Sequence, residues 1–147
     1  NNKTGEEILV GLCTRDALNK GKYKEWYTPE YRTYMNSSDR KKLDSLKLLL
    51  ADDIHIKVIM GTWCHDSQVQ VPRFFRMLDY LKFEQDNILI ICVDTEKEAV
   101  SFSIEELNIV LVPTFIIYKE EQEIGRIIES PIISLEQDLL DILKLQP

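Results

Sequence analysis

An α/β fold with a mixed central sheet is predicted by three features of the sequence. From residue 54 onward, short apolar runs rich in β-branched residues alternate with amphipathic stretches of helical periodicity. Near the C-terminal end, two strand-like runs, 112–119 and 124–130, flank the polar sequence EEQE and predict a hairpin. The length of 147 residues suits a single domain. Together these features predict a three-layer α/β/α sandwich with helices on both faces of the sheet.

The N-terminal part, residues 1–35, is expected to be a helical extension of a core formed by residues 36–147. A capping box that starts at Thr4, followed by apolar residues at helical spacing, predicts a helix over residues 4–19. The sequence Thr-Pro at 28–29 predicts a short helical turn that begins there. The aromatic residues around this turn are expected to fasten the extension to the core.

The core elements follow from local patterns of apolar residues, caps and proline. Continuous β-branched runs predict buried strands, and Ser or Thr three residues before Glu or Gln predicts helix starts. The expected order is helix 38–51, strand 54–61, helix 64–81 with Pro72 in its interior, strand 87–94, short helices from Thr95 and Ser103, strands 112–119 and 124–130, and a helix from Ser134.

Composition excludes several classes of function. The chain has 18 basic and 25 acidic side chains, and its net charge of -7 disfavours nonspecific binding to nucleic acid. No apolar stretch is long enough to cross a membrane. The three cysteines, Cys13, Cys64 and Cys92, have neither the spacing of a disulfide framework nor that of a metal site. Their sparseness slightly favours a cytoplasmic setting, although a start at Asn1 leaves a removed leader open.

Cys64 lies in the sequence GTWCHDSQVQVP, where a strand stops and a helix starts. Free N–H groups and the positive end of the helix dipole favour a thiolate at such a position, and the thiolate is the nucleophilic form. His65 adds positive charge when protonated, whereas Asp66 opposes the thiolate, and the sequence does not rank the two effects. Cys13 and Cys92 are interpreted as buried apolar residues. Cys64, His65 and Asp66 are adjacent in the chain, and such a set rarely converges on one metal ion.

Residues 54–147 resemble the thioredoxin family, and the matching residues are spread along this part of the chain. They are Trp63-Cys64 at a strand end, Pro72 in the following helix, Asp94 at the end of the next strand, and Val112-Pro113-Thr114 at the start of a later strand. The resemblance implies that Cys64 is an exposed nucleophile. It also implies that Pro113 lies against Cys64 in a cis peptide bond after Val112, where the backbone pairs with a substrate chain.

The sequence also departs from the family pattern. The second cysteine of the usual Cys-x-x-Cys motif is replaced by Ser67, which forms no disulfide but is able to donate a hydrogen bond to a Cys64 thiolate. Val58 stands where many thioredoxins bury an aspartate that assists the second thiol. Ser130-Pro131 stands near the usual position of a substrate-surface glycine. The paired loss at Ser67 and Val58 indicates a site adapted to one thiol.

The resemblance favours a monothiol thiol–disulfide oxidoreductase whose mixed disulfide is resolved by an external thiol. Two alternatives stay open: a thioredoxin-fold binding module without turnover, and a redox sensor that forms a sulfenic acid on Cys64. Protein disulfides or low-molecular-weight thiols are the expected substrates. No cofactor or metal is expected. An iron–sulfur site of the glutaredoxin type is disfavoured, because His65 and Asp66 stand where the glutaredoxin motif has Gly and Phe. The expected catalytic residues are Cys64, Ser67 and Pro113, and the expected substrate-binding residues are Trp63, His65, Asp66 and Val112.

Overall fold

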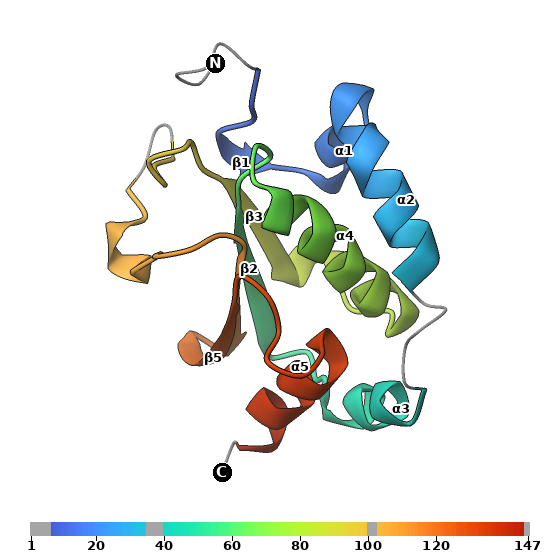
Figure 1. Ribbon diagram of the computed structural model, residues 1–147. Helices are drawn as coiled ribbons and strands as arrows, with labels where there is room; N and C mark the ends of the chain where they lie inside the picture. The colour runs from blue at the N-terminus through green and yellow to red at the C-terminus, as the bar shows by residue number, and fades with distance from the viewer. Residues whose placement is uncertain (1–6, 35–39, 100–102, 146–147) are drawn as a thin grey trace.

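A mixed β-sheet forms the centre of the molecule (Figure 1). The computed structural model describes residues 7–34, 40–99 and 103–145. Within these residues the sheet has five strands in the order β1-β3-β2-β4-β5. Strands β2 and β3 are parallel, whereas β1 against β3, β2 against β4, and β4 against β5 are antiparallel. The strands are β1 (Gly11–Cys13), β2 (Ile54–Met60), β3 (Ile88–Cys92), β4 (Thr114–Lys119) and β5 (Gln122–Ile128).

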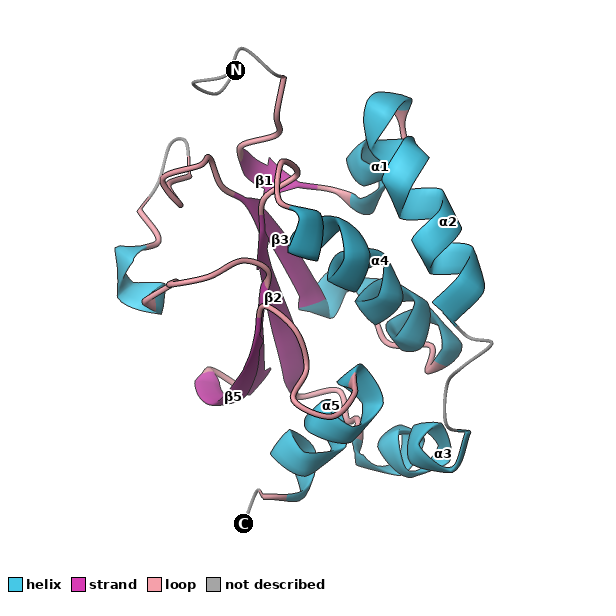
Figure 2. Ribbon diagram, in the orientation of Figure 1, coloured by secondary structure: helices cyan, strands magenta, loops and turns pink. Residues whose placement is uncertain are grey.

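The α-helices lie together on one side of the sheet in the view of Figure 2. Helix α2 packs along α4, and α3 packs along α5, which also contacts β5. The other face of β2 and β3 is covered by part of the chain that runs from β3 to β4 and contains the single-turn 3-10 helix η4 (Glu105–Leu107). The remaining helices are α1 (Arg15–Leu18), η1 (Gly21–Tyr23), α2 (Lys24–Tyr34), α3 (Arg40–Leu49), α4 (His65–Tyr80), η3 (Gln85–Asn87) and α5 (Leu135–Lys144). The predicted α/β fold class with a mixed central sheet is confirmed. The expected helices on both faces are found only in part, because in the described residues the second face carries the single-turn helix η4 and no α-helix.

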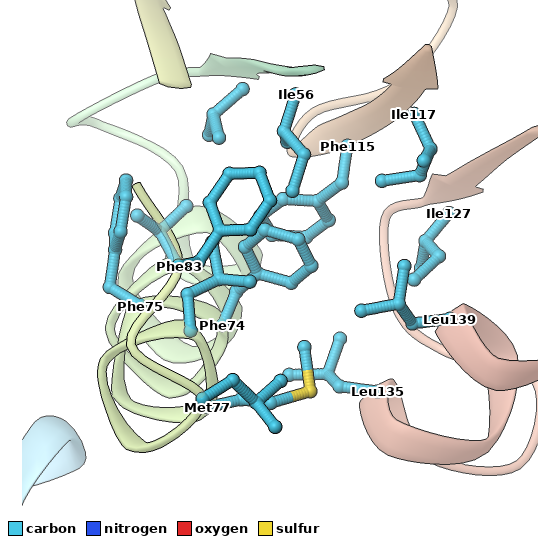
Figure 3. Packing of buried hydrophobic residues seen from close by; sticks show 14 of the residues in the cluster. Ile56, Phe74, Phe75, Met77, Phe83, Phe115, Ile117, Ile127, Leu135 and Leu139 are labelled. Atoms are coloured by element: carbon cyan, nitrogen blue, oxygen red, sulfur yellow. The ribbon is translucent and has the colours of Figure 1, made fainter. Parts of the chain in front are cut away.

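The main hydrophobic core lies between the sheet and helices α4 and α5. Phe74 of α4 stacks on Phe115 of β4 with ring centroids 4.1 Å apart, and α5 contributes Leu135 and Leu139 (Figure 3). Phe74 and Phe115 are fully buried, so this contact removes a large apolar area from water. The core therefore fixes α4, and with it the start of that helix, against β4.

The predicted helix over residues 4–19 is wrong for most of its described length. Residues 11–13 form β1, which pairs with β3, and only Arg15–Leu18 is helical. Gly11 has φ 101, a conformation that ends any helix before it. Pairing also covers the edge of β3, whose backbone groups would otherwise lack partners on that side. The proposed cap Thr4 lies outside the described residues.

Two smaller predictions also fail. Helix α2 begins at Lys24, and Pro29 lies inside it, so residues 28–29 do not start the helical turn. No helix starts at Thr95 in the described residues around it. Instead, the Asp94 carboxylate accepts hydrogen bonds from the N–H groups of Glu96 and Glu98 and forms a turn. An aspartate at the strand end therefore satisfies donors that a helix cap was expected to satisfy.

Aromatic side chains, as expected, and also a charged side chain connect α1 and α2 to the core. Arg15 donates two hydrogen bonds of 2.6 Å to the two carboxylate oxygens of Asp79 in α4. The Tyr31 hydroxyl donates to the same carboxylate, and the Tyr34 hydroxyl donates to Glu136 of α5.

Within the described part of the chain, no helix has the length and apolar character needed to cross a membrane.

Candidate active site around Cys64

Cys64 sits between the end of β2 and the start of α4. It is the N-cap of α4, with an extended backbone (φ -95, ψ 124), and its carbonyl accepts a hydrogen bond from Gln68 N at 3.0 Å. Its own N–H donates to Gly61 O at 3.0 Å, which closes a tight turn after the strand. The side chain is half-buried. The fold therefore places a partly accessible thiol at the N-terminal end of a helix of 16 residues.

The loop before β4 faces this thiol. Cys64 Sγ lies 3.5 Å from the carbonyl oxygen of Val112, and the Val112–Pro113 peptide bond is cis. Thr114 Oγ1 donates to Leu111 O at 2.7 Å, and Glu129 N donates to Pro113 O at 2.6 Å. These bonds hold the loop in place from both ends. The structure thus brings together residues that are 48 positions apart in the chain.

Two structural features surround the Cys64 sulfur. The first-turn N–H groups of α4 and the helix dipole stabilise negative charge near the N-terminus of the helix. On the other side, the Cys64 thiol donates a hydrogen bond to the carbonyl oxygen of Val112. The sulfur therefore lies between the start of α4 and the loop that precedes β4.

Ser67 is fully buried beneath the turn that carries Cys64. Its Oγ accepts a hydrogen bond from Gly61 N at 3.2 Å. The hydrogen bond to Cys64 Sγ that the sequence suggested is not formed between these two described residues. Ser67 satisfies a buried backbone donor, and through Gly61 it supports the turn.

The indole ring of Trp63 is held in place beside the turn that carries Cys64. Its indole N–H donates to Val93 O at 2.9 Å, beyond the end of β3. The ring lies so close to Gly61 that a Cβ at that position would come within 2.5 Å of it. A side chain at residue 61 would therefore displace the indole, which explains the glycine between β2 and the turn.

The other expected substrate-binding residues differ in accessibility. His65 is exposed and Asp66 is half-buried on the first turn of α4, whereas Val112 is buried and offers only its backbone to the site. Among the described residues, no group of His, Cys, Asp and Glu side chains is placed to hold a metal ion.

Sequence reasoning missed two neighbours of the site. Leu9 N donates to Thr62 Oγ1 at 3.3 Å, so the N-terminal segment touches the turn before Cys64. Exposed apolar side chains also flank the cis-proline loop and the loop after β5; they are Val110, Leu111, Ile132 and Ile133. The sequence does not predict that these side chains are exposed, because valine, leucine and isoleucine are also common in hydrophobic cores.

Similarity to known proteins concerns the fold. A protein of unknown function from Pseudomonas aeruginosa is 17% identical, and the match covers 91% of this chain and 90% of that one with a TM-score of 0.61. An HIV epitope scaffold is 14% identical, with 93% and 94% covered and a TM-score of 0.67. The reduced thioredoxin pre-protein of Schistosoma mansoni is 23% identical, with 69% and 87% covered and a TM-score of 0.44. No family sequence pattern and no curated protein sequence matches the chain.

The chain is thus an α/β protein of thioredoxin-like fold. This conclusion rests on the element order from β2 to α5, which is the order that the resemblance to thioredoxins implied, and on the strand order of the mixed sheet. The particular chemistry of the site is a separate question, since one fold serves many functions.

Proposed function

We propose that this protein is a monothiol thiol–disulfide oxidoreductase that acts through Cys64. The observation that carries the proposal is the position of Cys64 Sγ, at the N-terminus of α4 and 3.5 Å from the carbonyl that precedes the cis-proline. A partly accessible sulfur at a helix N-terminus is well placed for nucleophilic attack. The backbone of residues 111–113 beside it offers an edge along which an extended substrate chain can lie.

The reaction has two exchange steps. The Cys64 thiolate attacks one sulfur of a substrate disulfide; a Cys64–substrate disulfide forms, and the second substrate sulfur leaves as a thiolate that takes a proton from water. An external thiolate then attacks the substrate sulfur of the mixed disulfide and releases Cys64 as a thiolate. With a glutathionylated protein as substrate, the net result is transfer of the glutathione group to the external thiol.

An external thiol is needed because the chain offers no resolving cysteine at the site. Residue 67, one helical turn after Cys64, is a buried serine. Cys92 belongs to the core on the α4 face of the sheet, whereas Cys64 packs against the cluster on the opposite face. Val58, at the position where thioredoxins hold an acid for the second thiol, is fully buried in the apolar core. These residues support a site that works with one thiol.

The test compares wild type with Cys64→Ser in removing glutathione from a glutathionylated peptide, with reduced glutathione as the external thiol. Wild type is expected to accelerate the reaction, and Cys64→Ser is expected to give the uncatalysed rate. Cys13→Ser is the matched control, because it removes a half-buried thiol outside the site and should keep the wild-type rate. Equal rates for wild type and Cys64→Ser would refute the proposal.

A second candidate, a binding module without turnover, is favoured by exposed apolar residues in the loop before β4 and in the loop after β5, such as Leu111 and Ile132. Such a surface suits the apolar side chains of an unfolded chain. The probe is a labelled, cysteine-free apolar peptide. Binding that is equal in wild type and Cys64→Ser, and weakened by Ile132→Lys, would support this function; absence of binding by wild type would exclude it.

A further inference from the structure

A second pair of sulfur atoms lies away from Cys64. Cys13 Sγ and Cys92 Sγ are 2.8 Å apart, and both cysteines are free thiols. Cys13 is the last residue of β1 and Cys92 is the last residue of β3. The two strands are neighbours in the sheet (Figure 1). The expectation that both are isolated apolar residues is therefore incomplete: the fold joins two thiols that are 79 positions apart.

The strand register explains the contact. Cys13 pairs with Ile90, and Cys92 pairs with Gly11. Since alternate residues of a strand face the same side, Ile90 and Cys92 share a face with Cys13. The two cysteines are diagonal neighbours on that face, and the partner of Cys92 is a glycine without a side chain. This register accounts for the short distance between the two sulfur atoms.

We propose that Cys13 and Cys92 form a reversible disulfide that fastens β1 to the sheet. A disulfide bond is about 2.0 Å long, so the sulfur atoms need to approach by less than an ångström. Strand β1 has three residues, lies at the sheet edge and contains Gly11, so it can move by this amount without disturbing the core. Under oxidising conditions the bond adds a covalent link to this noncovalent edge contact.

The two thiols have different roles. Cys13 is half-buried and reachable, whereas Cys92 has 0% exposure. The hydrogen bond between the two thiols lowers the pKa of Cys13 despite partial burial. The same hydrogen bond, together with burial, raises the pKa of Cys92. Cys13 is thus the thiol that meets the oxidant, and Cys92 is the thiol that completes the bond.

The oxidant is a low-molecular-weight disulfide such as oxidised glutathione. The Cys13 thiolate attacks it, forming a mixed disulfide and releasing one glutathione thiolate. Cys92 Sγ then attacks Cys13 Sγ; the second glutathione leaves as a thiolate and takes the Cys92 proton. The two protein thiols are oxidised to one disulfide, and the oxidant is reduced to two thiols.

The bond also bears on the Cys64 site. The segment just before β1 reaches the turn that precedes α4, where Leu9 N donates to Thr62 Oγ1. Thr62 is two residues before Cys64 and is buried. A disulfide at Cys13 therefore holds in place the segment that covers one side of the turn.

The test uses the full chain with Cys64→Ser, so that no other cysteine can exchange. After treatment with oxidised glutathione and alkylation, trypsin leaves Cys13 in peptide 4–15 and Cys92 in peptide 83–97. The expected product is these two peptides joined by a disulfide, with no alkylation of either cysteine. Amide exchange at residues 11–13 is expected to slow by about tenfold, because β1 no longer detaches.

The additional change Cys92→Ala provides the matched control. It keeps Cys13 accessible, and treatment should leave a stable glutathione adduct on Cys13. If the Cys64→Ser protein shows the same adduct, or keeps both thiols free while the adduct forms in the control, the proposal is wrong. A joined peptide that persists after reduced glutathione is added in excess would contradict its reversibility.

Discussion

Gly61→Ala tests whether the close approach of Trp63 to the backbone fixes the indole ring beside the turn that carries Cys64. The new Cβ would lie 2.5 Å from the indole ring, so the ring must move away. Overpacking of this kind costs about 1–3 kcal/mol. Loss of the hydrogen bond from the indole to Val93 O costs about 1 kcal/mol more. The lower backbone entropy of alanine in the unfolded chain offsets about 0.4–1 kcal/mol. The expected net loss is about 1–4 kcal/mol.

The assay is urea unfolding followed by far-ultraviolet circular dichroism, because Trp63 fluorescence itself changes. The matched experiment repeats Gly61→Ala in a Trp63→Ala background, where the added methyl group meets no ring. There the substitution should cost nothing or stabilise the fold slightly. If Gly61→Ala costs the same in both backgrounds, the contact between residue 61 and the indole is not the cause, and the reasoning fails.

Three further changes have defined outcomes. Ser67→Cys should form a disulfide with Cys64 in oxidised glutathione and speed insulin reduction, while the lost acceptor for Gly61 N costs about 1 kcal/mol in urea unfolding; a free thiol pair after oxidation would contradict this. Oxidation of Cys13 and Cys92 should raise the free energy of unfolding by about 4–5 kcal/mol in urea melts; equal stability of the oxidised and reduced proteins would contradict this prediction. Burial raises the pKa of Asp79, but the hydrogen bonds from Arg15 and Tyr31, together with the positive charges of Arg15 and Arg76, outweigh burial and lower that pKa overall. Its stabilisation is therefore present above about pH 4 and lost as pH falls, so Asp79→Asn should destabilise at pH 7 by about 1–3 kcal/mol and less at pH 3; a constant difference would refute the assignment.

The elements from β2 to α5 were predictable because each carries its own local signal. The apolar β-branched run of β2 and the leucine stripe of α5 depend on neighbours within one element. The prediction that Ser134 caps the start of α5 is confirmed, since Ser134 Oγ accepts a hydrogen bond from Gln137 N at 3.0 Å. Local rules are sufficient where the decisive contacts are local.

The N-terminal segment shows where local rules stop. Residues 8–12 have helical spacing, yet Leu12 is 65% exposed and Gly11 turns the chain into β1. The decisive partner is the free edge of β3, far away in sequence, and its pairing outweighs a weak local preference. The same register brings Cys13 to Cys92, a contact that no spacing rule reveals.

At the candidate site, the sequence indicated the neighbours but not all of their bonds. The resemblance to thioredoxins implied that the sulfur of Cys64 lies beside a cis peptide bond before Pro113. In the structure, Cys64 Sγ lies next to the carbonyl oxygen of Val112, and the Val112–Pro113 bond is cis. The partner of Ser67, Gly61 N, depends on how the turn after β2 closes. Backbone donors are the same in every residue, so the sequence gives no sign of which one a serine will meet.

The most direct test of thiol exchange at Cys64 is a single-turnover trapping experiment. Wild-type protein is mixed with a glutathionylated peptide, quenched with acid, and its tryptic peptide 58–73, which contains Cys64, is examined by mass spectrometry. A disulfide adduct on this peptide that disappears when reduced glutathione is added is the expected result. A Cys64 that stays unmodified while the substrate is intact, or an adduct that reduced glutathione does not release, would contradict a monothiol mechanism.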